Sequence, residues 1–296
     1  MRRTLIAAVL TALPAWAHSE GPLKPHDLWS AWTFDPAVLV PVMLTAVLYA
    51  IGARSRRGAS GIQMVCFWSG WSFLALALLS PVHPLGEVLF AAHMSQHEIL
   101  MLLAAPLLVL SRPLAPMLWG MPFSWRRSLG RLSKGVQPVW ATITLPVNAF
   151  VIHAVALWVW HVPALFEATL RNDFIHAMQH LSFFASALLF WWSLLYANGR
   201  AGYGAAILYI FGTAIHTSIL GALLTFSTTI WYHAYETTAP EWGMTALEDQ
   251  QLGGLIMWVP AGLVYIVAGI GVLLPLLRET PERHTGLSPA RSRYAD

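Results

Sequence analysis

Seven apolar stretches, each long enough to cross a lipid bilayer, constrain the fold of this chain more than any other feature. They cover residues 36–53, 62–80, 87–110, 139–160, 175–196, 205–226 and 253–275. A hydrocarbon core roughly 30 Å thick requires about 20 such residues per helix. The chain is 57% hydrophobic and 10% charged, which is more apolar than a soluble core requires. The sequence therefore predicts an all-α integral membrane protein, with one bundle of seven transmembrane helices over residues 36–275.

The ends of the chain differ from this domain in composition. Arg2 and Arg3 precede a short apolar stretch, Pro14 and the small-residue sequence Ala15-Trp16-Ala17. A basic start, a short apolar core and a small-residue cleavage site are typical of a secretory signal peptide, here residues 1–17. Residues 18–35 are then predicted to form an outer, periplasmic arm, and residues 276–296 a polar cytoplasmic tail.

The basic residues predict the orientation in the membrane, because loops rich in lysine and arginine stay in the cytoplasm. If residue 18 lies outside, the outer segments contain only two basic residues, Lys24 and Arg171. The inner segments then contain Arg54, Arg56, Arg57, Arg112, Arg126, Arg127, Arg131, Lys134, Arg200, Arg278, Arg283, Arg291 and Arg293. This asymmetry predicts an N-out, C-in topology. Basic inner loops meet anionic lipid, so the positive charge does not point to a nucleic-acid partner.

Most of the histidines are predicted to lie at the outer end of this bundle. They are His83, His93, His97, His153, His161, His176, His180, His216 and His233. Ionisable side chains at membrane depth are costly and are usually functional. The asymmetry therefore indicates a site for a metal ion or a haem that faces one compartment.

Two histidine pairs have the spacing of ligands on one helical face. His93 and His97 are four residues apart, as are His176 and His180, so each pair lies one turn apart on one face. At 1.5 Å per residue, His153 and His216 lie about 12 and 15 Å deep, near the same level. His93, His97, His176 and His180 are the first-choice metal ligands, and His153, His216 and Asp249 are predicted to support them. The alternative for any one of these histidines is a hydrogen bond that holds two helices together.

Other residues in the outer half are weaker or more ambiguous candidates. His83, His161 and His233 lie in or beside the outer loops and are the weaker histidines. Asp249 has three possible roles: a carboxylate ligand, the hydrogen-bond partner of a ligating histidine, or an N-terminal helix cap. Gly253 and Gly254, which follow it, are predicted to permit close helix packing.

The side chains favour copper over the other metals. Imidazole suits zinc, copper, iron and nickel, and thioethers shift the preference to Cu(I). Met94, Met101, Met178 and Met257 lie on the same helices. Methionine is also a common filler of apolar cores, so this preference is weak. Zinc remains an alternative, and so does haem, because histidine pairs on two helices can also hold haem.

Several separated motifs resemble those of the CtaG family of caa-type cytochrome c oxidase assembly factors, which span the membrane several times. They are His93-Met94-Ser95-Gln96-His97-Glu98-Ile99-Leu100-Met101, Ala105-Pro106-Leu107-Leu108-Val109-Leu110 with Arg112-Pro113, Trp160-His161-Val162-Pro163-Ala164-Leu165-Phe166, His176-Ala177-Met178-Gln179-His180 with Phe190-Trp191-Trp192, and Asp249-Gln250-Gln251-Leu252-Gly253-Gly254-Leu255-Ile256-Met257-Trp258. The resemblance covers roughly residues 83–260. One departure is Pro106-Leu107, where the family often has two prolines.

The resemblance implies a protein of the bacterial inner membrane that assists maturation of a haem-copper oxidase by handling copper at the periplasmic face. The expected partners are an oxidase subunit, a periplasmic copper chaperone and membrane lipid. On this interpretation the protein is not an enzyme. Three alternatives use the same histidines: a zinc hydrolase that recruits Asp249, Ser95 and Ser182, a haem-binding electron carrier, and a copper permease.

Overall fold

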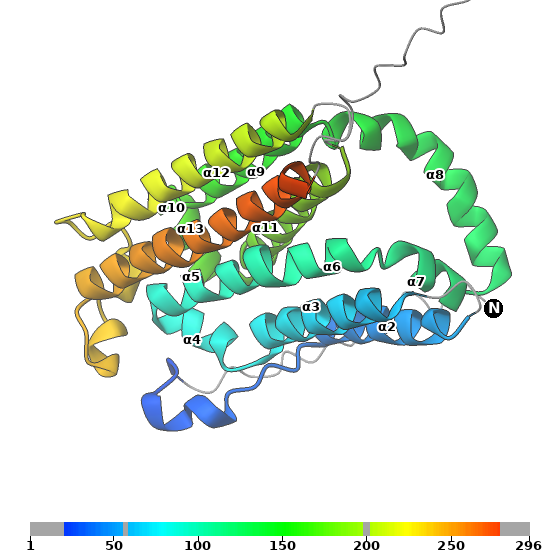
Figure 1. Cartoon of the computed structure of the whole chain (residues 1–296). Coiled ribbons are helices and arrows are strands. Elements are labelled where there is room, and N and C mark those ends of the chain that lie inside the picture. The colour runs from blue at the N-terminus through cyan, green and yellow to red at the C-terminus, as the bar shows by residue number, and fades with distance from the viewer. Residues whose placement is uncertain (1–20, 56–58, 198–201, 279–296) are drawn as a thin grey trace, which may run out of the picture.

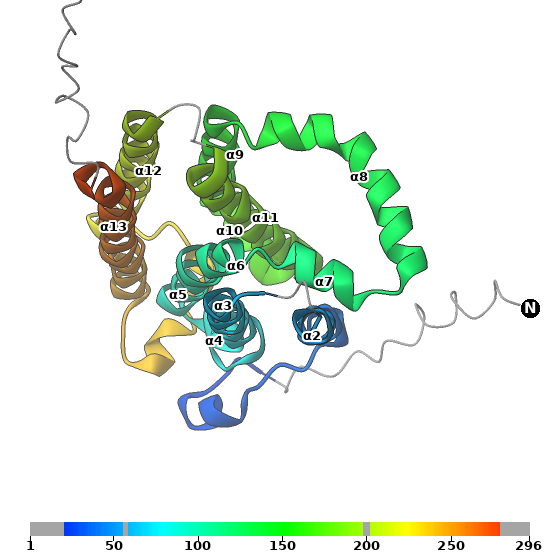
Figure 2. The same cartoon turned by 45° about the vertical axis from the view of Figure 1, so that its right-hand side comes forward.

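The computed structural model describes residues 21–55, 59–197 and 202–278. Over these ranges the chain is helical and contains no strand. Most helices lie alongside one another in a bundle, and α8 (Phe123–Ile143) bows out around one side of it (Figures 1 and 2). The predicted signal peptide and residues 279–296 of the predicted tail lie outside the described residues.

Six helical segments in the described part of the chain are long and apolar enough to cross a membrane. They are α2 (Pro36–Ala53), α3 (Gly61–Leu79), the segment Phe90–Ser111, the segment Asp173–Tyr196, α12 (Gly202–Thr225) and α13 (Ala246–Arg278). The sequence prediction of a multi-span helical protein is confirmed in this form. Helix α13 also extends to Arg278, three residues into the predicted tail.

The predicted fourth span, 139–160, is a bent pair of helices. Helix α8 and helix α9 (Pro146–Trp160) pass the membrane test only together, and they meet at an angle of 79°. The bend falls where Leu145 precedes Pro146, and a residue before proline is disfavoured in the α conformation. Alone, the 15 residues of α9 are about 22 Å long at 1.5 Å per residue. The described part of the chain therefore has six candidate spans, or seven if this bent pair counts as one.

The predicted third span, 87–110, is divided into shorter pieces. They are α4 (Val82–Val88), α5 (Phe90–Glu98), the π-helical turn η2 (Ile99–Ala104) and α6 (Ala105–Ser111). Leu89 is extended, with φ −135° and ψ 127°, and separates α4 from α5. Pro106 has no N–H to donate to the preceding turn, and the wider π turn lies just before it. The extended Leu89 lets α4 fold back along α5.

Helix α8 and its neighbour α7 (Leu114–Gly120) form the connection that precedes α9. No side chain of α8 is buried against the rest of the protein. Its apolar side chains include the exposed Phe123 and Leu132, and Arg126 stacks 4.5 Å from the ring of Trp119. An amphipathic helix of this kind is typical of the membrane interface.

The remaining helices are shorter or lie at the ends of the bundle. They are η1 (Pro25–Ser30) in the predicted outer arm, α10 (Pro163–Arg171), α11 (Asp173–Trp192), the π turn η3 (Ser193–Ala197), and the 3-10 turns η5 (His233–Tyr235) and η6 (Ala239–Trp242) between α12 and α13.

Helices α12 and α13 approach each other closely at glycine residues. A Cβ on Gly254 would lie 2.7 Å from the carbonyl oxygen of Gly221 and 2.6 Å from the backbone nitrogen of Thr225. A Cβ on Gly253 would collide with the ring of Phe90 on α5. The prediction that these two glycines permit close helix packing is confirmed.

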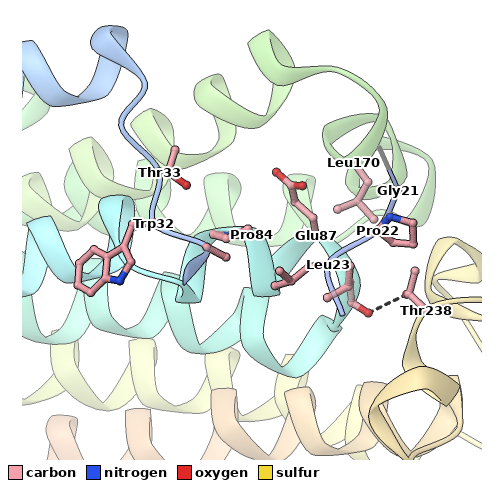
Figure 3. Close-up of a pocket in the computed structure, with 11 residues that line it drawn as sticks. Gly21, Pro22, Leu23, Trp32, Thr33, Pro84, Glu87, Leu170 and Thr238 are labelled. Carbon is pink, nitrogen blue, oxygen red and sulfur yellow. Dashed lines mark hydrogen bonds between the residues drawn. The ribbon is translucent and has the colours of Figure 1, made fainter. Parts of the chain in front are cut away.

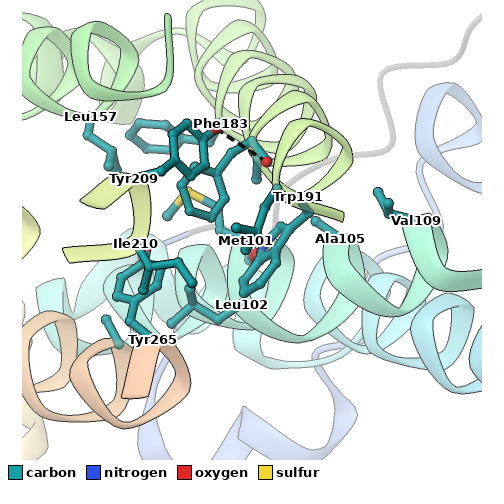
Figure 4. Packing of buried hydrophobic residues seen from close by; sticks show 14 of the residues in the cluster. Met101, Leu102, Ala105, Val109, Leu157, Phe183, Trp191, Tyr209, Ile210 and Tyr265 are labelled. Atoms are coloured by element: carbon teal, nitrogen blue, oxygen red, sulfur yellow. Dashed lines mark hydrogen bonds between the residues drawn. The ribbon is translucent and has the colours of Figure 1, made fainter. Parts of the chain in front are cut away.

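The main apolar core fixes α11 against the π turn η2 (Figure 4). The indole nitrogen of Trp191 donates to the carbonyl oxygen of Met101 at 2.9 Å, and the Tyr209 hydroxyl donates to the carbonyl oxygen of Phe190 at 3.2 Å. Phe183, buried in the same core, contacts the ring of His97 with centroids 4.6 Å apart. The core therefore sets the register of the two helices that carry the histidine pairs.

Candidate metal centre

Asp249 holds the start of α5. Its carboxylate oxygens accept hydrogen bonds from the backbone N–H groups of Phe90, at 2.6 Å, and Ala91, at 2.9 Å. Helix α5 has no cap from its own flanking residue Leu89, so Asp249 supplies that cap from the first turn of α13. Of its three possible roles, the structure places it as a helix cap, although the helix is α5 and not its own.

The four histidines of the two predicted pairs meet between α5 and α11. Within the pairs, the ring centroids of His93 and His97 are 4.5 Å apart, and those of His176 and His180 are 4.3 Å apart. Between the helices, His93 lies 5.2 Å from His176, and His97 lies 5.2 Å from His180. The helical spacing seen in the sequence therefore brings all four imidazoles into one cluster.

His83 joins this cluster from α4. Its ring stacks on that of His176 with centroids 5.3 Å apart and lies 5.9 Å from the ring of His180. Sequence analysis ranked His83 among the weaker candidates because it precedes the apolar stretch. Only the break at Leu89, which folds α4 back along α5, brings it to the other histidines, and hydrophobicity alone does not reveal that break.

Two groups of three histidines have ring nitrogens close enough to hold one metal ion. One group, the outer triad, is His83, His176 and His180; the other, the inner triad, is His93, His97 and His180. In each group the ligand atoms lie within 4.8 Å of one another. The inner triad is buried, while His83 of the outer triad is only half-buried. His180 belongs to both.

Several ring nitrogens in the cluster are buried without a hydrogen-bond partner. They are Nδ1 and Nε2 of His97, Nε2 of His176 and Nε2 of His180. A buried polar atom left without a partner costs about 1–3 kcal/mol. A cation that accepts the lone pairs of these imidazoles would offset that cost, so the chemistry of the donors fits a metal ion.

Two glutamines contact the remaining histidines of the triads. Gln96 Nε2 donates to the carbonyl oxygen of Ala77 at 2.7 Å and lies 3.0 Å from Nδ1 of His83. Gln179 Oε1 lies 3.1 Å from Nε2 of His93, whose Nδ1 lies 3.2 Å from the carbonyl oxygen of Gly86. A neutral imidazole carries one proton, so it cannot donate to both oxygens. Rotating the Gln179 amide would let its unpartnered Nε2 donate to His93, and a metal ion would compete for that same lone pair.

His153 and His216 lie apart from the triads. Nδ1 of His153 lies 3.0 Å from the Ser186 hydroxyl, and both ring nitrogens of His216 are without a partner. His153 and Met257 line a small separate cavity between the helices. The similar depth predicted for these two histidines therefore does not place them among the triad ligands.

His161 ends α9 beside the cluster but belongs to neither triad. Its Nδ1 donates to the carbonyl oxygen of Leu157 at 2.7 Å, and its Nε2 is buried without a partner. Burial lowers the pKa of His161 to about 4, although the hydrogen bond to Leu157 opposes that shift. The imidazole is therefore neutral near pH 7.

The methionines and the cysteine lie outside both triads. Met94 and Met257 pack in an apolar cluster with Phe90, and Met178 is exposed. Cys66 is a half-buried thiol on α3. The thioether argument for copper is therefore weaker in the structure than in the sequence.

An open cavity of about 370 Å³ lies at the outer surface beside α4. Figure 3 shows Pro84 and Glu87 of α4 in its wall, opposite Trp32 and Thr33 of the outer arm. His83 is the neighbour of Pro84 in the chain and the most exposed histidine of the two triads. Because α4 carries both His83 and residues of the cavity wall, the outer triad is closer to this cavity than the inner triad is.

Residues 47–279 match the family of cytochrome c oxidase caa3 assembly factors, Caa3_CtaG. The chain belongs to this family. The match includes both triads and Asp249, and it confirms the resemblance found in the sequence motifs.

Two curated relatives are known only as uncharacterized proteins, one from Mycobacterium bovis and one from Mycobacterium tuberculosis. Each is 26% identical to this chain over 282 residues, which cover 90% of this chain and 42% of the relative. The chain thus spans less than half the length of these relatives. No solved structure matches it.

Proposed function

We propose that this membrane protein assists the assembly of a haem-copper oxidase by binding copper through the two histidine triads. The site faces the periplasm from the outer leaflet of a bacterial inner membrane, and the protein acts as a metal-binding factor and not as an enzyme. Its partners are an oxidase subunit, which receives the copper, and a periplasmic copper chaperone, which supplies it.

The observation that carries this proposal is the cluster of buried imidazoles with unpartnered nitrogens. Histidines that served only to join helices would donate and accept hydrogen bonds across the interface. His97 has no partner at either ring nitrogen, although it lies in the middle of the cluster and is 1% exposed. Three imidazoles within ligand distance of one another satisfy a metal ion better than they satisfy one another.

The choice of copper rests on the imidazoles together with the family. A set of imidazoles suits both copper and zinc. Haem-copper oxidases contain copper, and their assembly requires copper to be inserted. A haem in the cluster is disfavoured, because the rings of His93, His97, His176 and His180 pack directly against one another, and the whole breadth of a macrocycle would have to be inserted between two of them.

The periplasmic placement follows from the charges of the loops. The triads lie at the end of the bundle that carries α10 and the loop between α12 and α13, where Lys24 and Arg171 are the basic residues in the described part of the chain. The opposite end carries Arg54, Arg112 and the basic face of α8. Basic loops stay in the cytoplasm, so the histidine end faces outward.

The direct test is Cu(I) binding by the purified protein in detergent, measured by competition with a chelator under reducing conditions. His97→Ala and His180→Ala should weaken binding by about 10- to 100-fold, the usual effect of disrupting a metal site. Cys66→Ser should bind like the unmodified protein. If both histidine variants bind Cu(I) as tightly as Cys66→Ser, the histidines only join the helices.

The same preparation separates the alternative functions. Purified protein that contains zinc and prefers it to Cu(I) would favour the hydrolase, and a haem absorption band would favour the electron carrier. Copper uptake into sealed vesicles that contain this protein alone would favour the permease. Each of these results would contradict delivery of copper to an oxidase.

The role in assembly is tested in cells that lack the protein. Their oxidase should contain haem but less copper, and added copper should partly restore activity, because a raised concentration replaces assisted delivery by mass action. His97→Ala should behave like the deletion and Cys66→Ser like the parent. Normal oxidase copper in the deletion strain, or a defect confined to haem, would refute copper delivery.

A further inference from the structure

The two triads differ in accessibility but share His180. The outer triad takes His83 from α4 and His176 from α11, whereas the inner triad takes His93 and His97 from α5. His180 is 8% exposed and belongs to both triads, with the ring of His83 at 5.9 Å and that of His97 at 5.2 Å.

We infer that the cluster holds one copper ion in two alternative positions and that the ion passes from the outer to the inner triad by exchanging ligands around His180. This inference rests on the proposed copper-binding function. His180 stays bound throughout, while His83 and His176 are replaced by His93 and His97. No bond other than the metal–nitrogen bonds is made or broken, and no electron is transferred.

The contacts within the cluster favour a copper ion that moves between two positions, and they disfavour a single site in which all five histidines bind the ion together. The imidazoles come from three helices and are packed ring against ring, with His83 stacked on His176 and His93 stacked on His176. Within the described residues, only the two triads bring the ring nitrogens within 4.8 Å of one another, and no set includes both His83 and His97. A single ion therefore reaches one triad or the other.

Each triad also contains one histidine held by a glutamine amide. Gln96 contacts His83, and Gln179 contacts His93. Gln96 lies on α5 between His93 and His97, and Gln179 lies on α11 between His176 and His180. A metal ion that binds either imidazole at the contacted nitrogen displaces the amide, which closes on the imidazole again when the ion leaves.

Burial and position give the direction of transfer. His83 is half-buried on α4, whose next residues line the 370 Å³ outer cavity. His93 and His97 are 0% and 1% exposed. Copper therefore reaches the outer triad first and is held more securely in the inner triad, where water does not compete.

The test compares His83→Ala with His97→Ala in two measurements on purified full-length protein: the equilibrium affinity for Cu(I), and the rate of Cu(I) transfer to an added chelator. Loss of His83 removes the access position, so His83→Ala should keep an affinity close to that of the unmodified protein while both loading and release slow markedly. Loss of His97 removes the secure position. His97→Ala should bind about 10- to 100-fold more weakly and release Cu(I) faster.

A double variant and a control complete the design. With two alternative positions, His83→Ala with His97→Ala should lose more affinity than the sum of the single effects, because each single variant retains one triad. His233→Ala, an exposed loop histidine paired with Glu236, should change neither measurement. His83→Gln is the second variant at that position if His83→Ala fails to fold.

Equal losses of affinity in His83→Ala and His97→Ala, with additive effects in the double variant, would establish one site of five ligands and overturn the two-position inference. That outcome would leave the proposed copper-binding function intact. Absence of Cu(I) binding in the unmodified protein would instead refute the proposed function.

Discussion

Removal of the Asp249 carboxylate should destabilise the protein without removing a metal ligand. Asp249→Ala deletes two hydrogen bonds, to the N–H groups of Phe90 and Ala91, and leaves both donors at the start of α5 without this partner. A hydrogen bond to a charged group contributes about 1.5–3 kcal/mol. The free energy of unfolding should therefore fall by about 3–6 kcal/mol, and by less in Asp249→Asn, which keeps one acceptor oxygen.

Unfolding in detergent titrated with SDS and followed by circular dichroism measures this difference, and Cu(I) per folded protein is measured in parallel. Glu248→Ala is the matched control, because its carboxylate is adjacent but exposed and contacts only Thr245. It should have a much smaller effect. If Asp249→Ala instead keeps its stability and loses Cu(I), the carboxylate is a metal ligand and its assignment as a cap is wrong.

Three further results are expected. Gln179→Leu removes the amide that competes for Nε2 of His93 without adding a metal ligand, so its affinity for Cu(I) should rise by about 2- to 10-fold in chelator competition, the equivalent of one hydrogen bond; unchanged affinity would contradict that competition. Gly254→Leu should abolish the close α12–α13 contact and the folded protein in gel filtration, whereas Gly271→Leu, with open space around it, should be tolerated. A reporter active only outside the cytoplasm should work in the loop between α12 and α13 and fail after Arg278, and the reverse pattern would refute the outward orientation of the site.

The sequence predicted the apolar segments and the pairing of histidines because both depend on local periodicity. A spacing of four residues places His93 with His97, and His176 with His180, whatever the rest of the chain does. Their meeting between α5 and α11 required only that the two helices pack side by side. Composition similarly predicted the helical class and the bundle of membrane spans.

The parts that the sequence did not predict depend on contacts between distant segments. Asp249 caps a helix that begins 159 residues earlier in the chain, and no local pattern indicates which helix receives the cap. His83 reaches the site because one residue, Leu89, is extended and folds α4 back along α5. His153 contacts Ser186 and not the triads, since a predicted depth along a helix does not fix the direction of a side chain.

The contacts of α4 explain how the loop between α12 and α13 is coupled to the histidine cluster. The carbonyl oxygen of Gly86 accepts from the Tyr235 hydroxyl at 2.9 Å, and that of Val88 accepts from the Thr238 hydroxyl at 2.7 Å. Both donors belong to the loop between α12 and α13, and both acceptors belong to the short helix that carries His83. A Cβ on Gly86 would lie 3.1 Å from Cα of His93, so α4 is also packed tightly on α5. The position of His83 therefore depends on the loop between α12 and α13. Because the same Gly86 carbonyl lies 3.2 Å from Nδ1 of His93, this loop is also linked to the inner triad.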